Sequence, residues 1–278
     1  MSRLLACTLL AGLLLAVVAV PAWAQPSGAD LIQTTIDRYA QRMADVENYA
    51  VTQTMSMMNM SMTTYYERDP DGGPLAYTTT TYVNGQASAS GPDASGDPYA
   101  ALACMKSKAS YAGTETIDGE TTHVVRIDDM GDCAEAMGMT DGEGMPEGEL
   151  SSGTMYIDTD DYVLRRMMME GTMNADGRTA DFSSTMTMSD YRTTDGLLHP
   201  WLTEMTMTGM DAMMGGEDGE DLQSQIAEMR AQMEEIPESM RGMIEDQIKM
   251  LEDSMTGDGM TMTMTVTEVT VNEGPPSQ

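Results

Sequence analysis

This chain is unusually rich in methionine, whose thioether sulfur can bind metal ions. It has 33 Met among 278 residues and a single Phe. Thioethers bind soft ions such as Cu(I). Four of them lie within six residues at Met57, Met58, Met60 and Met62. Soft-metal binding is therefore one chemistry that the sequence allows.

Most of the other Met residues alternate with hydroxyl or acidic residues at every second position, as in 184–188, 203–208 and 259–266. This period is typical of strands with one apolar and one polar face. Such an apolar face is either an ordinary filled core or the lining of a cavity, because Met is flexible enough to accept irregular apolar ligands. If it is a cavity, we expect these side chains to line it, with the last near its rim: Met186, Met188, Met205, Met207, Met262, Met264 and Trp201.

Cysteine and histidine offer few further possibilities. Two Cys lie outside the N-terminal leader described below, Cys104 and Cys133, and a disulfide between them is the leading interpretation for an exported protein. The alternative is a pair of buried thiols too far apart to join. His123 lies inside a predicted strand and His199 at the start of another, so we interpret both as structural.

No catalytic constellation emerges from the sequence. Carboxylates are so numerous that no pair stands out, and the usual serine-hydrolase, zinc-protease and phosphate-loop motifs are absent from the sequence. We therefore predict a protein that is not an enzyme, with no cofactor and no dedicated metal site as the first interpretation.

Residues 1–24 have the features of a signal peptide in the usual order. One basic residue, Arg3, precedes an apolar run, and the small residues Ala22 and Ala24 stand before Gln25. A membrane anchor is the alternative, but the run is short and no basic stop-transfer segment follows it. We predict cleavage before Gln25, export to the periplasm and no stable membrane insertion.

The formal net charge is −31, from 45 acidic against 14 basic residues. Such a surface repels nucleic acid and anionic membranes, so we exclude both as partners. Few Lys among many carboxylates is typical of halophilic proteins, in which concentrated salt screens the repulsion between charges.

The remaining segments predict an α+β, mainly β, domain over 25–278. An amphipathic helix is expected over 30–46, and 86–98 and 138–153 have loop composition. Hairpin turn signals separate the segments that we predict as antiparallel strands, namely 48–66, 75–83, 110–116, 121–129, 153–158, 162–174, 178–192, 197–209 and 259–272. A phase slip at Met57 and Met58 suggests either a bulge in the first of these strands or a strand covered on both sides.

Residues 211–258 differ in character, with apolar residues at three- and four-residue steps. We predict two helices, 218–236 and 238–255, separated at Pro237 and inserted into the last hairpin. Their apolar stripe either packs on the domain or binds a protein partner.

Several motifs together resemble the LolA-type outer-membrane lipoprotein-sorting family. They include residues 117–125, 156–165, the Asp-Tyr-Arg-x-x-Asp-Gly stretch leading to Pro200, and the closing strand that ends at Asn272. The resemblance implies a curved antiparallel half-barrel capped by helices, whose hollow holds acyl chains of lipoproteins. Chaperone-like carriage of a lipid-like ligand is therefore the expected function. A copper-binding protein and a structural or interaction domain with a filled core are the alternatives.

Overall fold

The computed structural model describes most of the chain outside the leader and the predicted insertion. The described residues are 25–56, 60–73, 75–83, 85–87, 100–133, 147–175, 178–209 and 259–276, with 226–227, 229–231, 241, 245 and 248. The predicted signal peptide lies outside them, as does most of 211–258. The described residues of that segment include two buried side chains, Ile226 and Ile248, both from the predicted apolar stripe. The helical insertion therefore stays a prediction.

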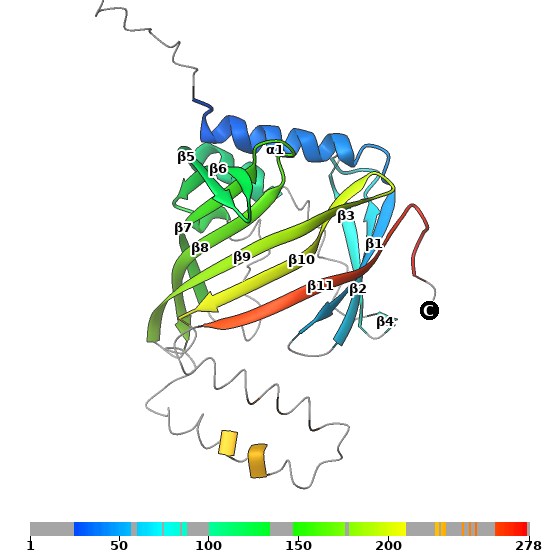
Figure 1. Ribbon diagram of the computed structural model, residues 1–278, viewed down its shortest axis with the longest axis vertical. Coiled ribbons are helices and arrows are strands. Elements are labelled where there is room, and N and C mark those ends of the chain that lie inside the picture. Colours follow the sequence, from blue (N-terminus) through cyan, green and yellow to red (C-terminus); the bar gives the residue numbers. More distant parts are fainter. Residues whose placement is uncertain are drawn as a thin grey trace, which may run out of the picture.

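Eleven strands form one antiparallel sheet that curves strongly in space (Figure 1). The order is β4-β3-β2-β1-β11-β10-β9-β8-β7-β6-β5, so the first and last long strands meet in the middle. In chain order the strands are β1 Asn48–Met55, β2 Met60–Arg68, β3 Tyr77–Val83, β4 Gln86–Ala87, β5 Ala109–Ile117, β6 Glu120–Asp128, β7 Glu147–Asp158, β8 Leu164–Ala175, β9 Arg178–Thr194, β10 Leu197–Thr208 and β11 Met260–Val271. Within the described residues the two edges do not pair with each other. The predicted open, mainly β half-barrel is confirmed.

Two of the predicted strand assignments were wrong. The segment 48–66 is not one strand, because β1 ends at Met55 and pairs with the start of β2 at Met60. The phase slip that suggested a bulge therefore lies in the sequence between two antiparallel strands. Residues 147–152, predicted as loop, belong to β7, since pairing with β8 places even this Gly- and Ser-containing stretch in the sheet.

Outside 211–258, the described residues include four helical segments, and only the first of these was predicted. They are α1 Gly28–Arg42, α2 Ala100–Met105, and the short 3₁₀ turns η1 Lys106–Lys108 and η2 Gly131–Cys133. The Ser27 side chain caps α1 by accepting a hydrogen bond from the Asp30 backbone N–H at 3.0 Å. No helix in the described part of the chain is long and apolar enough to cross a membrane.

Helix α1 lies across the sheet at one end of the long strands (Figure 1). Its first turns contribute Leu31 and Ile32 to one core cluster, and Met43, just after its end, belongs to a second. Ile36 contacts both clusters. We call the sheet face that α1 covers the inner face.

The first core cluster joins α1 to the strands on one side of the sheet. Its buried members from the sheet lie on β6 to β9, and Met105 and Met130 close it from α2 and the segment before η2. The second cluster gathers Tyr49, Val51 and the start of β10 at Leu197 with the end of β11. A bulge beside the Thr52–Gln53 step lets Val266, Val269 and Val271 of β11 all face inward.

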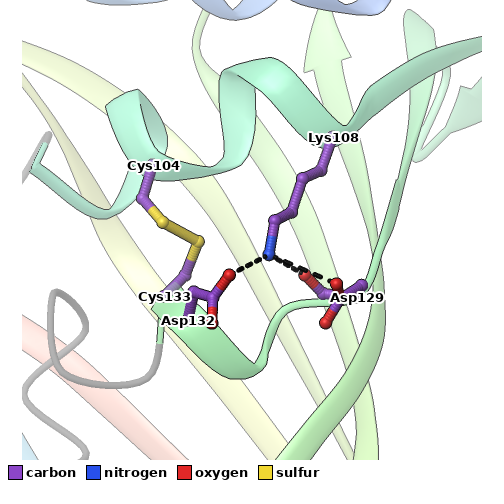
Figure 2. Close-up of a disulfide and its surroundings, with 5 residues drawn as sticks. All are labelled: Cys104, Lys108, Asp129, Asp132 and Cys133. Atoms are coloured by element: carbon purple, nitrogen blue, oxygen red, sulfur yellow. Dashed lines mark hydrogen bonds and ion pairs between the residues drawn. A yellow bond between two sulfur atoms is a disulfide. The ribbon is translucent and has the colours of Figure 1, made fainter.

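A disulfide joins Cys104 of α2 to Cys133 of η2, with their Cα atoms 5.7 Å apart (Figure 2). The predicted pairing is confirmed. Beside it, the Lys108 ammonium donates to the Asp129 backbone carbonyl at 2.6 Å and to the Asp132 carboxylate at 3.0 Å. The covalent bond and these polar contacts hold α2 and η2 together over the first core cluster.

Removing this covalent link should destabilise the domain. The disulfide spans a sequence separation of 29 residues, and loop-closure entropy for such a span gives about 3 kcal/mol. The double variant Cys104→Ala/Cys133→Ala should therefore lose about that much free energy of unfolding in urea titrations. The unsubstituted protein in reductant is the matched comparison. Equal midpoints for oxidised, reduced and substituted protein would contradict the prediction.

Candidate functional site

One row of side chains crosses six neighbouring strands on the inner face. Each member is the direct cross-strand partner of the next, and such partners point to the same side of a sheet. From β6 to β11 the row consists of Val125, Met155, Met167, Met186, Met205 and Met262.

The burial of this row changes sharply along its length. Val125 and Met155 are fully buried and Met167 is 7% exposed, so the core is filled over β6 to β8. Met186, Met205 and Met262 are only partly buried, although they have the same residue type and face the same side. Met186 still touches the first core cluster. Along this row the buried core therefore ends between Met167 of β8 and Met186 of β9, although Phe182, farther along β9, is also buried.

The other predicted Met residues extend this partly exposed surface along the strands. Thr203 of β10 pairs with both Met188 and Met264, and Met207 pairs with Met260. All seven of these Met side chains on β9 to β11 are partly exposed, and we call them the Met surface: Met186, Met188, Met205, Met207, Met260, Met262 and Met264. The structure thus brings together all six Met residues named from the sequence and adds Met260.

The Met surface is free of charge in a chain that carries 45 acidic residues. Within 180–188 of β9, 199–207 of β10 and 260–266 of β11, every acidic residue occupies the alternate, outward-pointing position. The two are Asp181 and Glu204, and both are exposed. An apolar ligand placed on the inner face would therefore bury no carboxylate.

The outer face of the same strands is rich in hydroxyl groups. Thr206 and Thr261 share a hydrogen bond at 3.2 Å, and Ser183 and Thr208 share one at 2.7 Å. The predicted division into one apolar Met face and one Thr-rich face is confirmed for β9 to β11.

Trp201 lies on the inner face of β10, between the Met surface and the second core cluster. It is partly buried and packs against that cluster. The Arg192 guanidinium stacks on its ring, 4.3 Å from the centroid. Its indole Nε1 is shielded from solvent and has no hydrogen-bond partner within the described residues. The sequence placed Trp201 near the rim of a cavity but gave no sign of Arg192.

Two histidines lie close to the inner-face residues. His199 is two residues before Trp201, and burial lowers its pKa to about 4. His123 lies beside the rings of Tyr111 and Tyr162, and burial also lowers its pKa. Both imidazoles are therefore neutral at pH 7, as expected of structural histidines.

The buried end of the row was not predicted from the sequence. Met155 was not among the predicted residues, and Met167 belongs to a run of three consecutive Met whose directions cannot be read from alternation. In the structure Met167 faces inward, opposite Met155 and Met186, whereas Met168 faces outward and accepts a hydrogen bond from the Tyr156 hydroxyl at 3.7 Å. The inward position of Met155 could have been found from the alternation of β7, had its strand been predicted at full length.

The soft-metal alternative stays a prediction. Met57 and Met58 lie outside the described residues, and Met60 and Met62 lie on β2. Among the described residues no group of three or more His, Cys, Asp or Glu side chains is arranged to hold a metal ion.

Comparison with known proteins finds similar solved structures from bacteria. An outer membrane lipoprotein-sorting protein domain from Vibrio parahaemolyticus has 11% sequence identity and a TM-score of 0.43, covering 90% of this chain and 94% of that chain. A DUF1329 family protein from Desulfovibrio piger has 8% identity and a TM-score of 0.41, covering 90% and 93%. A LolA superfamily protein from Nitrosomonas europaea has 8% identity and a TM-score of 0.31, covering 90% and 96%.

Two of these structures bear the name of the family that the sequence motifs resemble. At this identity the similarity concerns the arrangement of the chain alone. No family model matches the chain, and no curated protein matches it in sequence.

The burial of His199 makes stability depend on pH in a defined direction. Its pKa is about 4 when folded, against 6.5 for the ordinary imidazole, so the unfolded chain binds more protons between these values. Stability from this residue is present above pH 6.5 and is lost as pH falls toward 4. Between pH 7 and pH 4.5, the free energy of unfolding should therefore fall by about 2 kcal/mol less in the variant His199→Gln than in the unsubstituted protein.

The measurement is the free energy of unfolding in urea at pH 7 and pH 4.5, for the unsubstituted protein and the variant. Surface carboxylates titrate in both proteins, so their contribution to the change in unfolding free energy cancels when the two proteins are compared. An identical change with pH in the two proteins would show that His199 is not held neutral by the fold.

Proposed function

We propose that this protein is a periplasmic carrier or chaperone that binds lipid-like apolar ligands, such as the acyl chains of lipoproteins, on its Met surface. The observation that carries the proposal is the row from Val125 to Met262, in which one apolar face is filled over β6 to β8 and partly exposed over β9 to β11. A protein that only needed a core would gain stability by covering the exposed part.

The chemistry of the Met surface suits a flexible hydrocarbon chain. Met side chains have several rotatable bonds and repack around irregular apolar groups. Burial of each CH₂ group contributes ~0.8 kcal/mol, so a partly enclosed chain of about a dozen carbons gains useful affinity without a polar contact. The absence of charged side chains on this part of β9 to β11 means that no carboxylate loses water when the ligand binds.

The geometry also explains why such a ligand would stay on one side of the sheet. The side of the inner face next to β6 to β8 is closed by α1 and by the disulfide-linked segments α2 and η2. A chain lying on the Met surface therefore meets a packed wall at β8. The outer face offers it hydroxyls and carboxylates instead of apolar surface.

A charge placed at the centre of the Met surface should abolish ligand binding. In Met205→Glu the ligand must bury a carboxylate, which costs more than the 1.4 kcal/mol of one tenfold step, so affinity for a fluorescent fatty acid should fall more than about tenfold. Thr206→Glu is the matched control, because it adds the same charge to the next residue on the outer face. Met205→Leu, which keeps the apolar volume, should bind within a few-fold of the unsubstituted protein.

Thermal unfolding of each variant separates loss of binding from loss of fold. The proposal requires that Met205→Glu stays folded because its side chain reaches solvent in the free protein. No binding by the unsubstituted protein, or equal losses in Met205→Glu and Thr206→Glu, would contradict the carrier function. Unfolding of Met205→Glu alone would favour the filled-core alternative.

A further inference from the structure

The inner face contains one polar group that the fold leaves unsatisfied next to the Met surface. The Trp201 indole N–H is buried and has no acceptor within the described residues. A buried donor without a partner costs free energy, and native proteins keep few of them. An unsatisfied donor beside an apolar binding surface is the arrangement expected where a ligand supplies the missing acceptor.

Arg192 adds further donors at the same place. Its guanidinium stacks on the Trp201 ring, and its side chain is 53% exposed. Two of its nitrogens bind the Asp190 carboxylate, at 3.1 Å from Nε and 2.5 Å from Nη2. A guanidinium has five N–H groups, so this ion pair uses two of them and leaves the others oriented away from Asp190.

The Arg192–Asp190 pair is close to neutral as a unit. It therefore offers hydrogen-bond donors without a strong positive field, and the whole chain carries a net charge of −31. This combination favours a head group whose oxygen atoms accept hydrogen bonds, such as an ester or a carboxyl group. It gives little advantage to a highly charged head group, which the negative chain repels.

We infer that Trp201 and Arg192 bind the oxygen-bearing head of the apolar ligand, and that its hydrocarbon chain runs from there along β10 toward Met205 and Met207. The inference rests on the proposed function. Six residue steps separate Trp201 from Met207, which is ~20 Å along an extended strand. The inner-face positions of β10 between Trp201 and Met207 are Thr203 and Met205. Neither is charged, so the indole and guanidinium donors lie together at the Trp201 end, next to the hydroxyl of Thr203.

The orientation can be measured with Trp201 as the reporter. The full sequence has two Trp, Trp23 and Trp201, so the full chain carrying Trp23→Phe has a single indole whether or not the leader is removed. Bromine quenches indole fluorescence only at short range. We therefore compare 2-bromohexadecanoic acid, labelled beside the carboxyl group, with 16-bromohexadecanoic acid, labelled at the far end.

At equal occupancy, set by displacement of a fluorescent fatty acid, the 2-bromo compound should quench Trp201 more strongly. Equal quenching by the two, or stronger quenching by the 16-bromo compound, would overturn the inference while leaving the carrier function intact. Failure of either acid to displace the fluorescent probe would instead count against the carrier function itself.

Arg192→Leu tests the head-group contact, with Arg166→Leu as the matched control. Arg166 also stacks on an aromatic ring, that of Tyr156 at 5.8 Å, but on the outer face. Loss of a hydrogen bond to a polar head should weaken binding of hexadecanoic acid or of its methyl ester by about tenfold in Arg192→Leu. Arg192→Leu should also abolish the difference in quenching between the two brominated probes. Arg166→Leu should keep both the affinity and this difference.

Comparing the acid with its methyl ester distinguishes the sources of the head group. Tighter binding of the ester indicates an acylated molecule, and tighter binding of the acid indicates a free fatty acid. Unchanged affinity and unchanged probe discrimination in Arg192→Leu would show that this arginine serves only to shield Trp201.

Discussion

The structure depends on how much of a wide apolar sheet face one helix can cover. Within the described residues α1 is the one helix longer than two turns, and it packs on one face of an eleven-stranded sheet. It does so by contributing to two clusters, with Ile36 touching both. The disulfide-linked segments α2 and η2 complete the cover over β6 to β8. The Met surface on β9 to β11 remains partly exposed.

The residue types on that remaining surface follow from its exposure. A rigid aromatic or branched side chain suits a packed interior, whereas Met can contact either solvent or an incoming chain by changing rotamer. The same reasoning explains the strict separation of charge. Within 180–188 of β9, 199–207 of β10 and 260–266 of β11 the carboxylates occupy outward positions, where water solvates them, so a ligand on the Met surface covers none of them.

Much of the fold could be predicted because its signals are local. Period-two alternation of Met and Thr gave β9 to β11 and their two faces, and the Cys104–Cys133 pair followed from the count of cysteines outside the leader. The reversal between Met55 and Met60 was missed because alternation continues on both sides of the turn. The strand character of residues 147–152 was missed because it comes from pairing with β8, which local composition does not encode.

The candidate site could likewise be predicted only where its signals are local. Which Met residues face the same side could be read from their spacing, but their burial could not, since Met155 and Met205 look alike in sequence and differ only through what covers them. Likewise, nothing in the spacing of Arg192 and Trp201 indicates that they stack. Their contact arises from the β9–β10 pairing, in which Trp201 lies opposite Asp190 and Arg192 pairs with His199, two residues before Trp201.

The most direct test of the carrier function is photo-crosslinking with a fatty acid that carries a diazirine group in its hydrocarbon chain, followed by peptide mapping. If the Met surface binds the chain, the crosslinks will concentrate on the β9, β10 and β11 peptides that contain Met186, Met205 and Met262. Excess unlabelled fatty acid will suppress them. Crosslinks spread over the outer face, or insensitive to competition, would show that the partly exposed Met side chains do not form a lipid-binding site.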